Sequence, residues 1–339
     1  MIIRKKILVP VPNVAHLTTD EFDDKLSNAN EVLIKTHYSH ISAGTELACI
    51  AGKESFFSIP GTPGYTAVGE IIELGSDVKD LKKGDLVFTY GPHAEYFKID
   101  VTDRWHGVCV KLPDHINPEL AVFTHMGNIA ITALRKSNIE LGDFVLVTGL
   151  GAIGNIIAQL CQLQGGNVIA SDINQKRIQI GIDCGIKTIV NSSESDLMEF
   201  VEKETLNQLV TTYIDASGMS KVIERSIDCL TLDGEIIILG SPRAKHETDL
   251  TEFLQHFHNL PWSHHMKGAL EFTFPTHTNE FNKHSIERNS KIIMNLIQQE
   301  TLNIKPLYSQ KIKPEEIQKV YDGLKNNPEK FIGVIIDWR

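Results

Sequence analysis

The stretch VLVTGLGAIGN, residues 145–155, sets three glycines in the order Gly149-x-Gly151-x-x-Gly154. An apolar, strand-like run precedes these glycines, and a helix-like segment follows them from residue 153 to about 163. In such a unit the first glycine allows a tight turn, the second lets a ligand approach the backbone, and the third allows close helix packing. Because the N-terminus of the helix attracts negative charge, the pattern predicts a dinucleotide pyrophosphate site.

An acidic residue supports this prediction. Asp172 ends the next apolar segment, NVIASD, which follows Gly154 along the chain. A carboxylate at this place accepts the ribose hydroxyls of NAD and repels the extra phosphate of NADP. We therefore predict NAD as the cofactor; the competing interpretation is that the glycines only pack and that Asp172 caps a helix. The predicted cofactor-binding residues are Gly149, Gly151, Ala152, Ile153, Gly154, Asp172, Arg177 and Gly240.

The surrounding sequence alternates strand-like and helix-like segments. The strand-like runs TIVN, TTYIDAS and GEIIILG are separated by segments in which apolar residues recur at helical spacing. This β-α-β-α succession is typical of a doubly wound parallel sheet. The first third of the chain differs, because short apolar runs are separated by turn residues at Gly75, Gly84 and Gly91, which indicates a mostly-β unit.

Composition excludes several classes of partner. The formal net charge is −10 at pH 7, and no basic cluster interleaved with aromatic residues is present, so we expect neither nucleic acid nor a membrane as a partner. The longest apolar runs have the length of strands, and the N-terminus makes a poor signal peptide. The five cysteines are scattered without a CxxC pair, which fits a reducing compartment. We expect a cytoplasmic protein.

Two long segments resemble the medium-chain dehydrogenase/reductase family. They are IPGTPGYTAVGEIIELGSDVKDLKKGDLVF and LNIKPLYSQKIKPEEIQKVYDGL. The resemblance implies an α/β protein with a GroES-like, mostly-β catalytic domain over residues 1–126 and 283–339, and a Rossmann domain over residues 127–282. It also implies pairing of copies through a sheet edge, for which KGALEFTF is suited, so a homodimer or homotetramer is expected.

The metal ligands of the family's zinc enzymes are not retained at the matching positions. The cysteine position of the first ligand turn is Ala43, the Gly-His-Glu turn becomes Gly64-Tyr65-Thr66, and the third ligand falls on or near His125. Since zinc takes about three protein ligands in a catalytic site, we expect no metal. The motifs ISAGTE, GPHAEYF, GSPR and ERN resemble a zinc-lacking branch, the bacteriochlorophyllide a dehydrogenase-like group.

Alcohol oxidation without a metal requires side chains that move the hydroxyl proton and stabilise the developing oxyanion. The resemblance places Thr45 where the family has its proton-relay hydroxyl, and Tyr65 and His125 at former ligand positions. Our hypothesis is that His125 or Tyr65 handles the proton, while Thr45 links the substrate hydroxyl to the nicotinamide ribose. Glu46 would orient the turn or pair with a cation. A turn-bonded Thr45, a core His125 and a packing Tyr65 are the alternatives.

Two other groups of histidines in the sequence give little indication of a metal site. His37 and His40 stand three apart on a predicted strand, so they should point to opposite faces. The cluster HFHNLPWSHH, residues 256–265, suits a surface connection or a wall of the substrate cleft better than a metal site. Arg243 follows a predicted sheet strand, where ligands bind in such folds, so it could meet a cofactor, an anionic substrate or solvent.

The leading functional hypothesis is a zinc-independent, NAD-dependent dehydrogenase. Its substrate would be a small secondary alcohol or polyol-like hydroxyl, or the corresponding ketone in reverse. An NAD(P)H quinone or enone reductase is the second enzyme hypothesis. A catalytically inactive dinucleotide-binding protein is the third, and it predicts NAD(H) binding without turnover.

Overall fold

The chain forms two compact units. The structure is a computed structural model that describes residues 1–339, except for the side chain of Glu329. Unit 1 consists of residues 1–125 and 274–339, and unit 2 of residues 126–273. Unit 1 therefore resumes at residue 274, whereas residue 283 was expected from the sequence.

Unit 2 is built on a six-stranded sheet with the order β10-β9-β8-β11-β12-β13. Every adjacent pair of these strands is parallel. The direction of winding reverses between β8 and β11, which gives the doubly wound topology that the sequence predicted. The strands are β8 Phe144–Thr148, β9 Asn167–Asp172, β10 Thr188–Asn191, β11 Val210–Asp215, β12 Leu230–Ile238 and β13 His265–Gly268.

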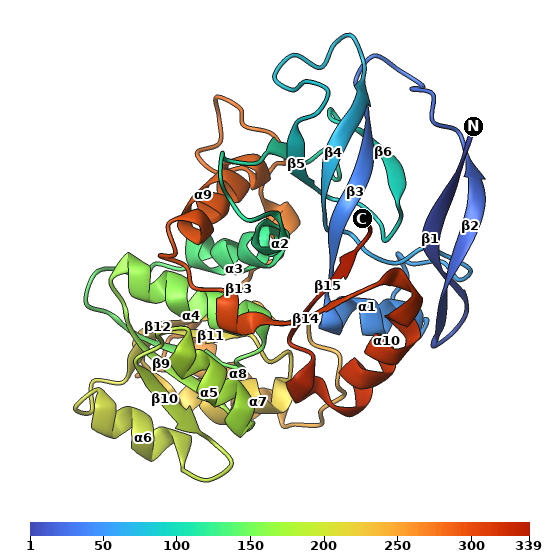
Figure 1. The fold of residues 1–339 in the computed structure, drawn as a ribbon. Helices are drawn as coiled ribbons and strands as arrows, with labels where there is room; N and C mark the ends of the chain where they lie inside the picture. Colours follow the sequence, from blue (N-terminus) through green and yellow to red (C-terminus); the bar gives the residue numbers. More distant parts are fainter. The chain divides into compact units, whose positions relative to one another are not determined.

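Helices connect the strands of unit 2, the green-to-yellow part of Figure 1. They are α4 Ala152–Gln164, α5 Gln175–Asp183, α6 Leu197–Glu204, α7 Ser220–Ser226 and α8 Leu250–His258. The side chains of Asn174, Asp196 and Asp249 accept hydrogen bonds from backbone amides and so cap α5, α6 and α8. Helix α8 was not predicted, and none of its residues is buried. No helix of the described chain is long and apolar enough to cross a membrane.

The sheet edge of unit 2 differs from the expected one. Strand β13 is an edge strand, but it ends at Gly268, so only the first two residues of the segment 267–274 belong to it. The amide of Ala269 donates to the carbonyl of Ile238, after which a 3-10 turn forms over Glu271–Thr273. The remainder of the predicted edge segment therefore offers no strand for pairing.

Unit 1 contains a seven-stranded sheet whose main path is β14-β15-β3-β4-β5-β7, with β6 paired to β3. The C-terminal strand β15 lies antiparallel to β3 and parallel to β14, so chain segments far apart in sequence complete one sheet. This confirms a mostly-β unit. The strands are β3 Glu31–Ile41, β4 Ala67–Leu74, β5 Leu86–Thr89, β6 Tyr96–Asp100, β7 Cys109–Lys111, β14 Tyr308–Ile312 and β15 Gly333–Asp337.

A hairpin, five helices and three short 3-10 turns belong to unit 1 or to the segment that leads into unit 2. The hairpin strands are β1 Ile2–Val11 and β2 Val14–Phe22; the helices are α1 Ala43–Ile50, α2 Pro118–Ala121, α3 Thr124–Lys136, α9 Ile286–Gln298 and α10 Ile317–Asn326. The 3-10 turns of unit 1 are Lys305–Leu307, Pro314–Glu316 and Pro328–Lys330. Unit 2 has a 3-10 turn at Ile227–Cys229 in addition to the one at Glu271–Thr273. The ligand turn expected at Ala43 is the first turn of the helix α1, and the segment that begins at Pro118 forms two helices, α2 and α3.

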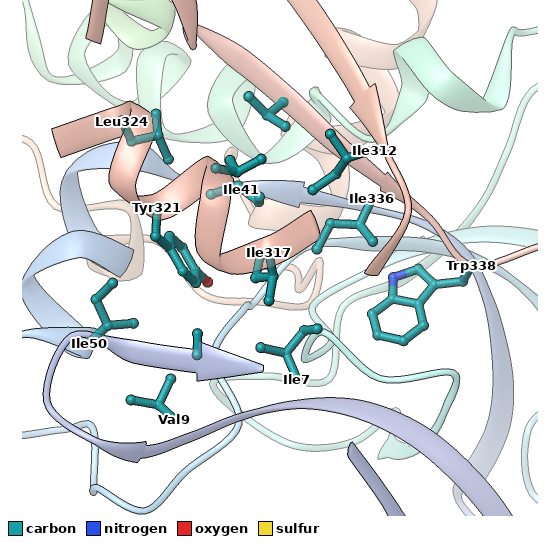
Figure 2. Close-up of a cluster of buried hydrophobic side chains, with 13 residues drawn as sticks. Ile7, Val9, Ile41, Ile50, Ile312, Ile317, Tyr321, Leu324, Ile336 and Trp338 are labelled. Atoms are coloured by element: carbon teal, nitrogen blue, oxygen red, sulfur yellow. The ribbon is translucent and has the colours of Figure 1, made fainter. Parts of the chain in front are cut away.

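One apolar cluster joins the early and late segments of unit 1. Figure 2 shows Ile7 of β1, Ile41 of β3, Ile50 of α1 and Tyr321 of α10 within it. All four side chains are at most 3% exposed. Burial of each such side chain stabilises the folded protein by about 1.5–3 kcal/mol. The cluster therefore holds α1 against α10.

Candidate active site

The first candidate site lies where β3 leads into α1. Ser42 is the N-cap of α1, and its backbone N–H donates to the Oε1 atom of Glu46 over 2.8 Å. The carboxylate of Glu46 therefore closes the first turn of the helix and fixes the Thr45 side chain within that turn. This confirms the hypothesis that Glu46 orients this segment.

The hydroxyl of Tyr65 meets this turn. The side chains of Ser42 and Thr45 both hydrogen-bond to it, and we call these three groups the hydroxyl cluster. Burial and the negative charge of Glu46 raise the pKa of Tyr65 well above its ordinary value, although the two hydroxyls act in the opposite direction. Tyr65 is therefore protonated at neutral pH and can donate a hydrogen bond.

The imidazole of His125 lies against Tyr65, near the start of α3. Its ring centroid is 5.0 Å from that of Tyr65, and its other side stacks on Tyr90 at 4.1 Å with an interplanar angle of 4°. Its Nδ1 atom is 2.7 Å from the Thr66 hydroxyl and 3.2 Å from the Tyr65 carbonyl oxygen. A carbonyl only accepts, so Nδ1 is the donor in its contact with Tyr65.

The three residues predicted for catalysis thus come together in unit 1. Thr45 reaches the Tyr65 hydroxyl, and the Tyr65 ring contacts the ring of His125. A tyrosine hydroxyl and an imidazole thus lie side by side, and both kinds of group can take part in acid–base chemistry on an alcohol.

Sequence reasoning missed two residues that hold the Glu46 carboxylate in place, His93 and Tyr321. His93 is fully buried, and its Nε2 atom is 2.9 Å from Oε2 of Glu46. Tyr321 donates its hydroxyl hydrogen to the same oxygen over 2.8 Å. His93 stands in the motif GPHAEYF, but the contact spans 47 residues and leaves no periodic signal in the sequence.

A second buried histidine lies near His125. The His40 side chain is 1% exposed, its ring centroid is 4.7 Å from that of Phe123, and neither ring nitrogen has a hydrogen-bond partner among the described residues. Burial, with a smaller contribution from His125, lowers the pKa of His40 to about 3. His37 lies 3.7 Å from Glu70 and is half-buried. The two histidines point to opposite faces of β3, as predicted.

The donor set of unit 1 does not fit a catalytic zinc ion. Ala43 has no donor atom, Tyr65 is a protonated hydroxyl, and Nδ1 of His125 already donates to a carbonyl. Among the residues that the structure describes, no three His, Cys, Asp or Glu side chains are grouped so as to hold a metal ion. A zinc ion needs about three protein ligands, which these residues do not supply.

The second candidate site lies at the start of α4 in unit 2. Gly149 has φ of +89°, in the left-handed region, and a Cβ atom on Gly154 would lie 1.7 Å from the Gly149 carbonyl oxygen. A Cβ atom on Gly151, the N-cap of α4, would meet no atom within 4 Å. Gly149 and Gly154 are thus required by the fold, while the space at Gly151 is open, as the predicted pyrophosphate site requires. Ala152 and Ile153 form the first turn of α4, whose amides face this space.

Asp172 lies beside this glycine turn at the end of β9. Its Oδ2 atom accepts the backbone N–H of Leu150 over 2.6 Å, and its Oδ1 atom accepts that of Asn174 over 2.8 Å. The guanidinium of Arg177 is 3.8 Å from Oδ2. The backbone therefore holds the carboxylate at the mouth of the turn, where a ribose would meet it. These residues fit a nicotinamide dinucleotide.

A further acidic residue, Asp215, was missed. It ends β11, is fully buried, and accepts hydrogen bonds from the Thr148 hydroxyl and from the Ser217 and Gly218 backbone amides. Burial raises its pKa. The amide of Gly240 donates to the Asp215 carbonyl over 2.7 Å, and a Cβ atom on Gly240 would lie 2.4 Å from the Gly218 nitrogen. Close packing explains the glycine at position 240.

The histidine cluster of residues 256–265 forms stacks and ion pairs. The rings of His256 and His264 stack at 5.7 Å between centroids, and His256 lies 3.9 Å from Asp228. His265 begins β13 and lies 2.9 Å from Asp233. Arg243 belongs to the segment that follows β12.

Two family models match the chain. The alcohol dehydrogenase GroES-like domain matches residues 28–147, and the zinc-binding dehydrogenase model matches residues 152–282. D-guloside 3-dehydrogenase from Shigella flexneri is 30% identical over 256 residues, which cover 68% of this chain and 72% of that protein. The chain belongs to the medium-chain dehydrogenase/reductase family.

Solved structures of the family share the fold. Galactitol-1-phosphate dehydrogenase from Escherichia coli has a TM-score of 0.84 at 16% identity, covering 98% of this chain and 99% of that one. A putative zinc-binding dehydrogenase from Sinorhizobium meliloti 1021, bound to NADP, has a TM-score of 0.79 at 19% identity, covering 99% and 100%. The GroES-like and Rossmann domains expected from the sequence are confirmed.

Membership in the medium-chain dehydrogenase/reductase family also fixes the class of reaction. The chain is an oxidoreductase that acts on CH–OH groups and uses a nicotinamide cofactor. The residues predicted to bind the cofactor lie on unit 2, and the residues predicted for catalysis lie on unit 1.

Proposed function

We propose that this chain oxidises a secondary alcohol or polyol-like hydroxyl with NAD, or reduces the ketone, without a zinc ion. The observation that supports this most directly is the donor set of unit 1. Where zinc enzymes place ligands, this chain has Ala43, the protonated hydroxyl of Tyr65, and His125, whose Nδ1 contacts a carbonyl oxygen. The replacement of zinc ligands at these positions also fits the zinc-lacking, bacteriochlorophyllide a dehydrogenase-like branch that the sequence resembles.

The proposed reaction needs two functions from unit 1. A side chain must accept the proton of the alcohol, and a hydrogen-bond donor must stabilise charge on its oxygen. His125 or Tyr65 handles the proton, and Thr45 links the substrate hydroxyl to the nicotinamide ribose. The bound nicotinamide ring supplies the hydride acceptor.

The choice of NAD over NADP rests on Asp172. Its carboxylate is held by two backbone amides beside the glycine turn, and at this position a negative charge repels the 2′-phosphate of NADP. A polyol-like substrate is supported by the relative from Shigella flexneri, which is named for a D-guloside.

The test combines metal analysis with turnover of the purified protein. We expect reduction of NAD, but not of NADP, with secondary alcohols or polyols, in protein that contains no stoichiometric zinc and that is not inhibited by a chelator. Stoichiometric zinc whose removal abolishes activity would contradict the proposal. Faster turnover of quinones with NADPH would favour a reductase, and NADH binding without any turnover would favour an inactive binding protein.

We also propose that copies of the chain pair as a homodimer or homotetramer through β13. This strand is the edge of the unit 2 sheet, and Met266 within it is 44% exposed. An unpaired edge strand is a template for pairing with another chain. Sedimentation of the wild type and of Met266→Lys tests this: a lysine here should dissociate the oligomer, while a monomeric wild type would refute it.

A further inference from the structure

The loops that follow β8, β11 and β12 in unit 2 meet at one residue, Asp215. This residue ends β11 and is fully buried. Its carboxylate accepts the hydroxyl hydrogen of Thr148, which ends β8, and the backbone amides of Ser217 and Gly218, each over 3.1 Å. Its backbone carbonyl accepts the amide of Gly240, which follows β12, over 2.7 Å. Asp215 therefore ties together three loops at the carboxyl edge of the sheet.

The turn after β11, residues 216–218, packs directly on the glycine turn. A Cβ atom on Gly149 would lie 2.9 Å from the backbone nitrogen of Ser217. A Cβ atom on Gly154 would lie 3.1 Å from the Cβ atom of Ala216. Ala216 and Ser217 are partly exposed, so this turn reaches the surface. Residues 216–218 thus form a wall beside the turn that is predicted to bind the pyrophosphate, and we call this turn the second wall.

The order of the strands indicates which half of the dinucleotide the second wall meets. Strand β8 lies between β9 and β11, and the direction of winding reverses between β8 and β11. A dinucleotide lies across the carboxyl ends of the strands at such a point. Asp172, predicted to bind the adenosine ribose, ends β9 on one side of β8, whereas Asp215 ends β11 on the other side. The nicotinamide half then lies towards the loops that follow β11 and β12.

We propose that Asp215 is a positioning residue for the nicotinamide half of the cofactor. Asp215 is fully buried, so it acts through the loops that it holds. Its carboxylate sets the distance between the second wall and the glycine turn, and its carbonyl fixes Gly240 beside them. The inference rests on the proposed dinucleotide site at Asp172 and the glycine turn.

This role requires a carboxylate. The Oδ1 atom of Asp215 accepts from the Thr148 hydroxyl and the Ser217 amide, while Oδ2 accepts from the Gly218 amide. An asparagine has nearly the same shape, but its NH2 group replaces one of the two acceptors. At least one of the three donors would then face another donor. Because a buried donor without an acceptor is costly, the second wall should move.

Asp215→Asn tests the proposal when NADH and AMP are compared as ligands, because AMP has the adenosine but no nicotinamide. We expect the affinity for NADH to fall about tenfold or more, while the affinity for AMP stays close to that of the wild type. Asp172→Ser is the reciprocal variant and should weaken both ligands. Calorimetric titration provides the dissociation constants. An equal loss of both affinities in Asp215→Asn, or an unchanged affinity for NADH, would overturn the inference.

Tyr213→Phe is the matched control from the same buried network. The Tyr213 hydroxyl lies 3.0 Å from that of Thr148, but it binds no amide of the three loops that Asp215 ties together. Its removal should lower the melting temperature and leave the ratio of the NADH and AMP affinities unchanged. A change of this ratio equal to that in Asp215→Asn would show that any defect in the network has this effect, and would contradict a specific role of Asp215.

Hydrogen exchange in the wild type gives a readout that needs no variant to fold. Saturating NADH should slow amide exchange in residues 215–219 more than saturating AMP does, because only NADH reaches the second wall. Equal protection by the two ligands would overturn the inference. Zinc-dependent turnover or tighter binding of NADPH would contradict the proposed function alone, and NADPH then replaces NADH in the comparison. Binding of neither reduced dinucleotide would refute both proposals.

Discussion

The Nδ1 atom of His125 lies 3.2 Å from the backbone carbonyl oxygen of Tyr65. This contact fixes the hydrogen on Nδ1, and so the residue that presents its hydroxyl to the site also sets the tautomer of the neighbouring imidazole. A base and a donor are thereby held in one arrangement before any substrate binds.

The roles of the three predicted catalytic residues can be separated by mutation. His125→Gln should lower kcat/KM for alcohol oxidation by about 100- to 10,000-fold, because general acid–base catalysis contributes that much. Tyr65→Phe and Thr45→Ala should each lower it as well, since they remove a hydrogen bond to the reacting oxygen or to the ribose. Steady-state kinetics provide the measurement, with His37→Gln on the other face of β3 as control. Wild-type kcat/KM in all three variants would rule out the assignment.

Two glycines of α4 should respond oppositely to alanine. Gly151→Ala adds a methyl group in open space, so the melting temperature should stay close to that of the wild type while NADH binding weakens. Gly154→Ala places a Cβ atom 1.7 Å from the Gly149 carbonyl oxygen, so it should lower stability. Overpacking of this kind costs about 1–3 kcal/mol or more. Calorimetry and fluorescence titration with NADH distinguish the two, and unchanged NADH affinity of Gly151→Ala would contradict the predicted cofactor site.

Asp172→Ser tests cofactor choice. Hydrogen bonds to a charged group contribute about 1.5–3 kcal/mol, so the affinity for NADH should fall about tenfold or more. NADPH binding should improve relative to NADH, because the charge that repels the 2′-phosphate is gone. Dissociation constants for both dinucleotides provide the measurement. A wild type that binds NADPH as tightly as NADH would show that Asp172 does not select the cofactor.

His40 should make stability depend on pH in the acidic range. The unfolded side chain has a pKa of about 6.5, whereas in the folded protein burial lowers the pKa of His40 to about 3. The unfolded chain therefore takes up the proton first, and the free energy of unfolding falls as pH drops from about 6.5 towards 3. His40→Leu removes this contribution, so its unfolding free energy should fall less steeply in urea titrations across this range. Parallel pH dependence of both proteins would contradict the lowered pKa.

The sequence predicted unit 2 well because its signals are local. Strand β8, the glycine turn and α4 are adjacent in the chain, and the backbone requires glycine at Gly149 and Gly154. Asp172 likewise follows its strand directly. Helix α8 was the exception. None of its side chains is buried, so its apolar residues gave little indication of a helix.

Unit 1 was predicted less completely because its key contacts are non-local. Thr45 and Tyr65 were identified from the sequence, but the helix α1 depends on Glu46 as a cap and on packing against α10. Tyr321 contacts Glu46 across 275 positions of the chain. No pattern within a short window of sequence contains such a pairing.

The pairing of β3 with β15 has a consequence for synthesis. Unit 2 is one continuous segment of the chain, so all of it leaves the ribosome before β15 does. Domains generally fold as units while the chain is being synthesised. Residues 1–125, by contrast, must wait for β15, which is translated after all of unit 2. During that interval the part of β3 that pairs with β15, residues 38–41, lacks this partner, and a nascent chain in this state is a natural client for a chaperone.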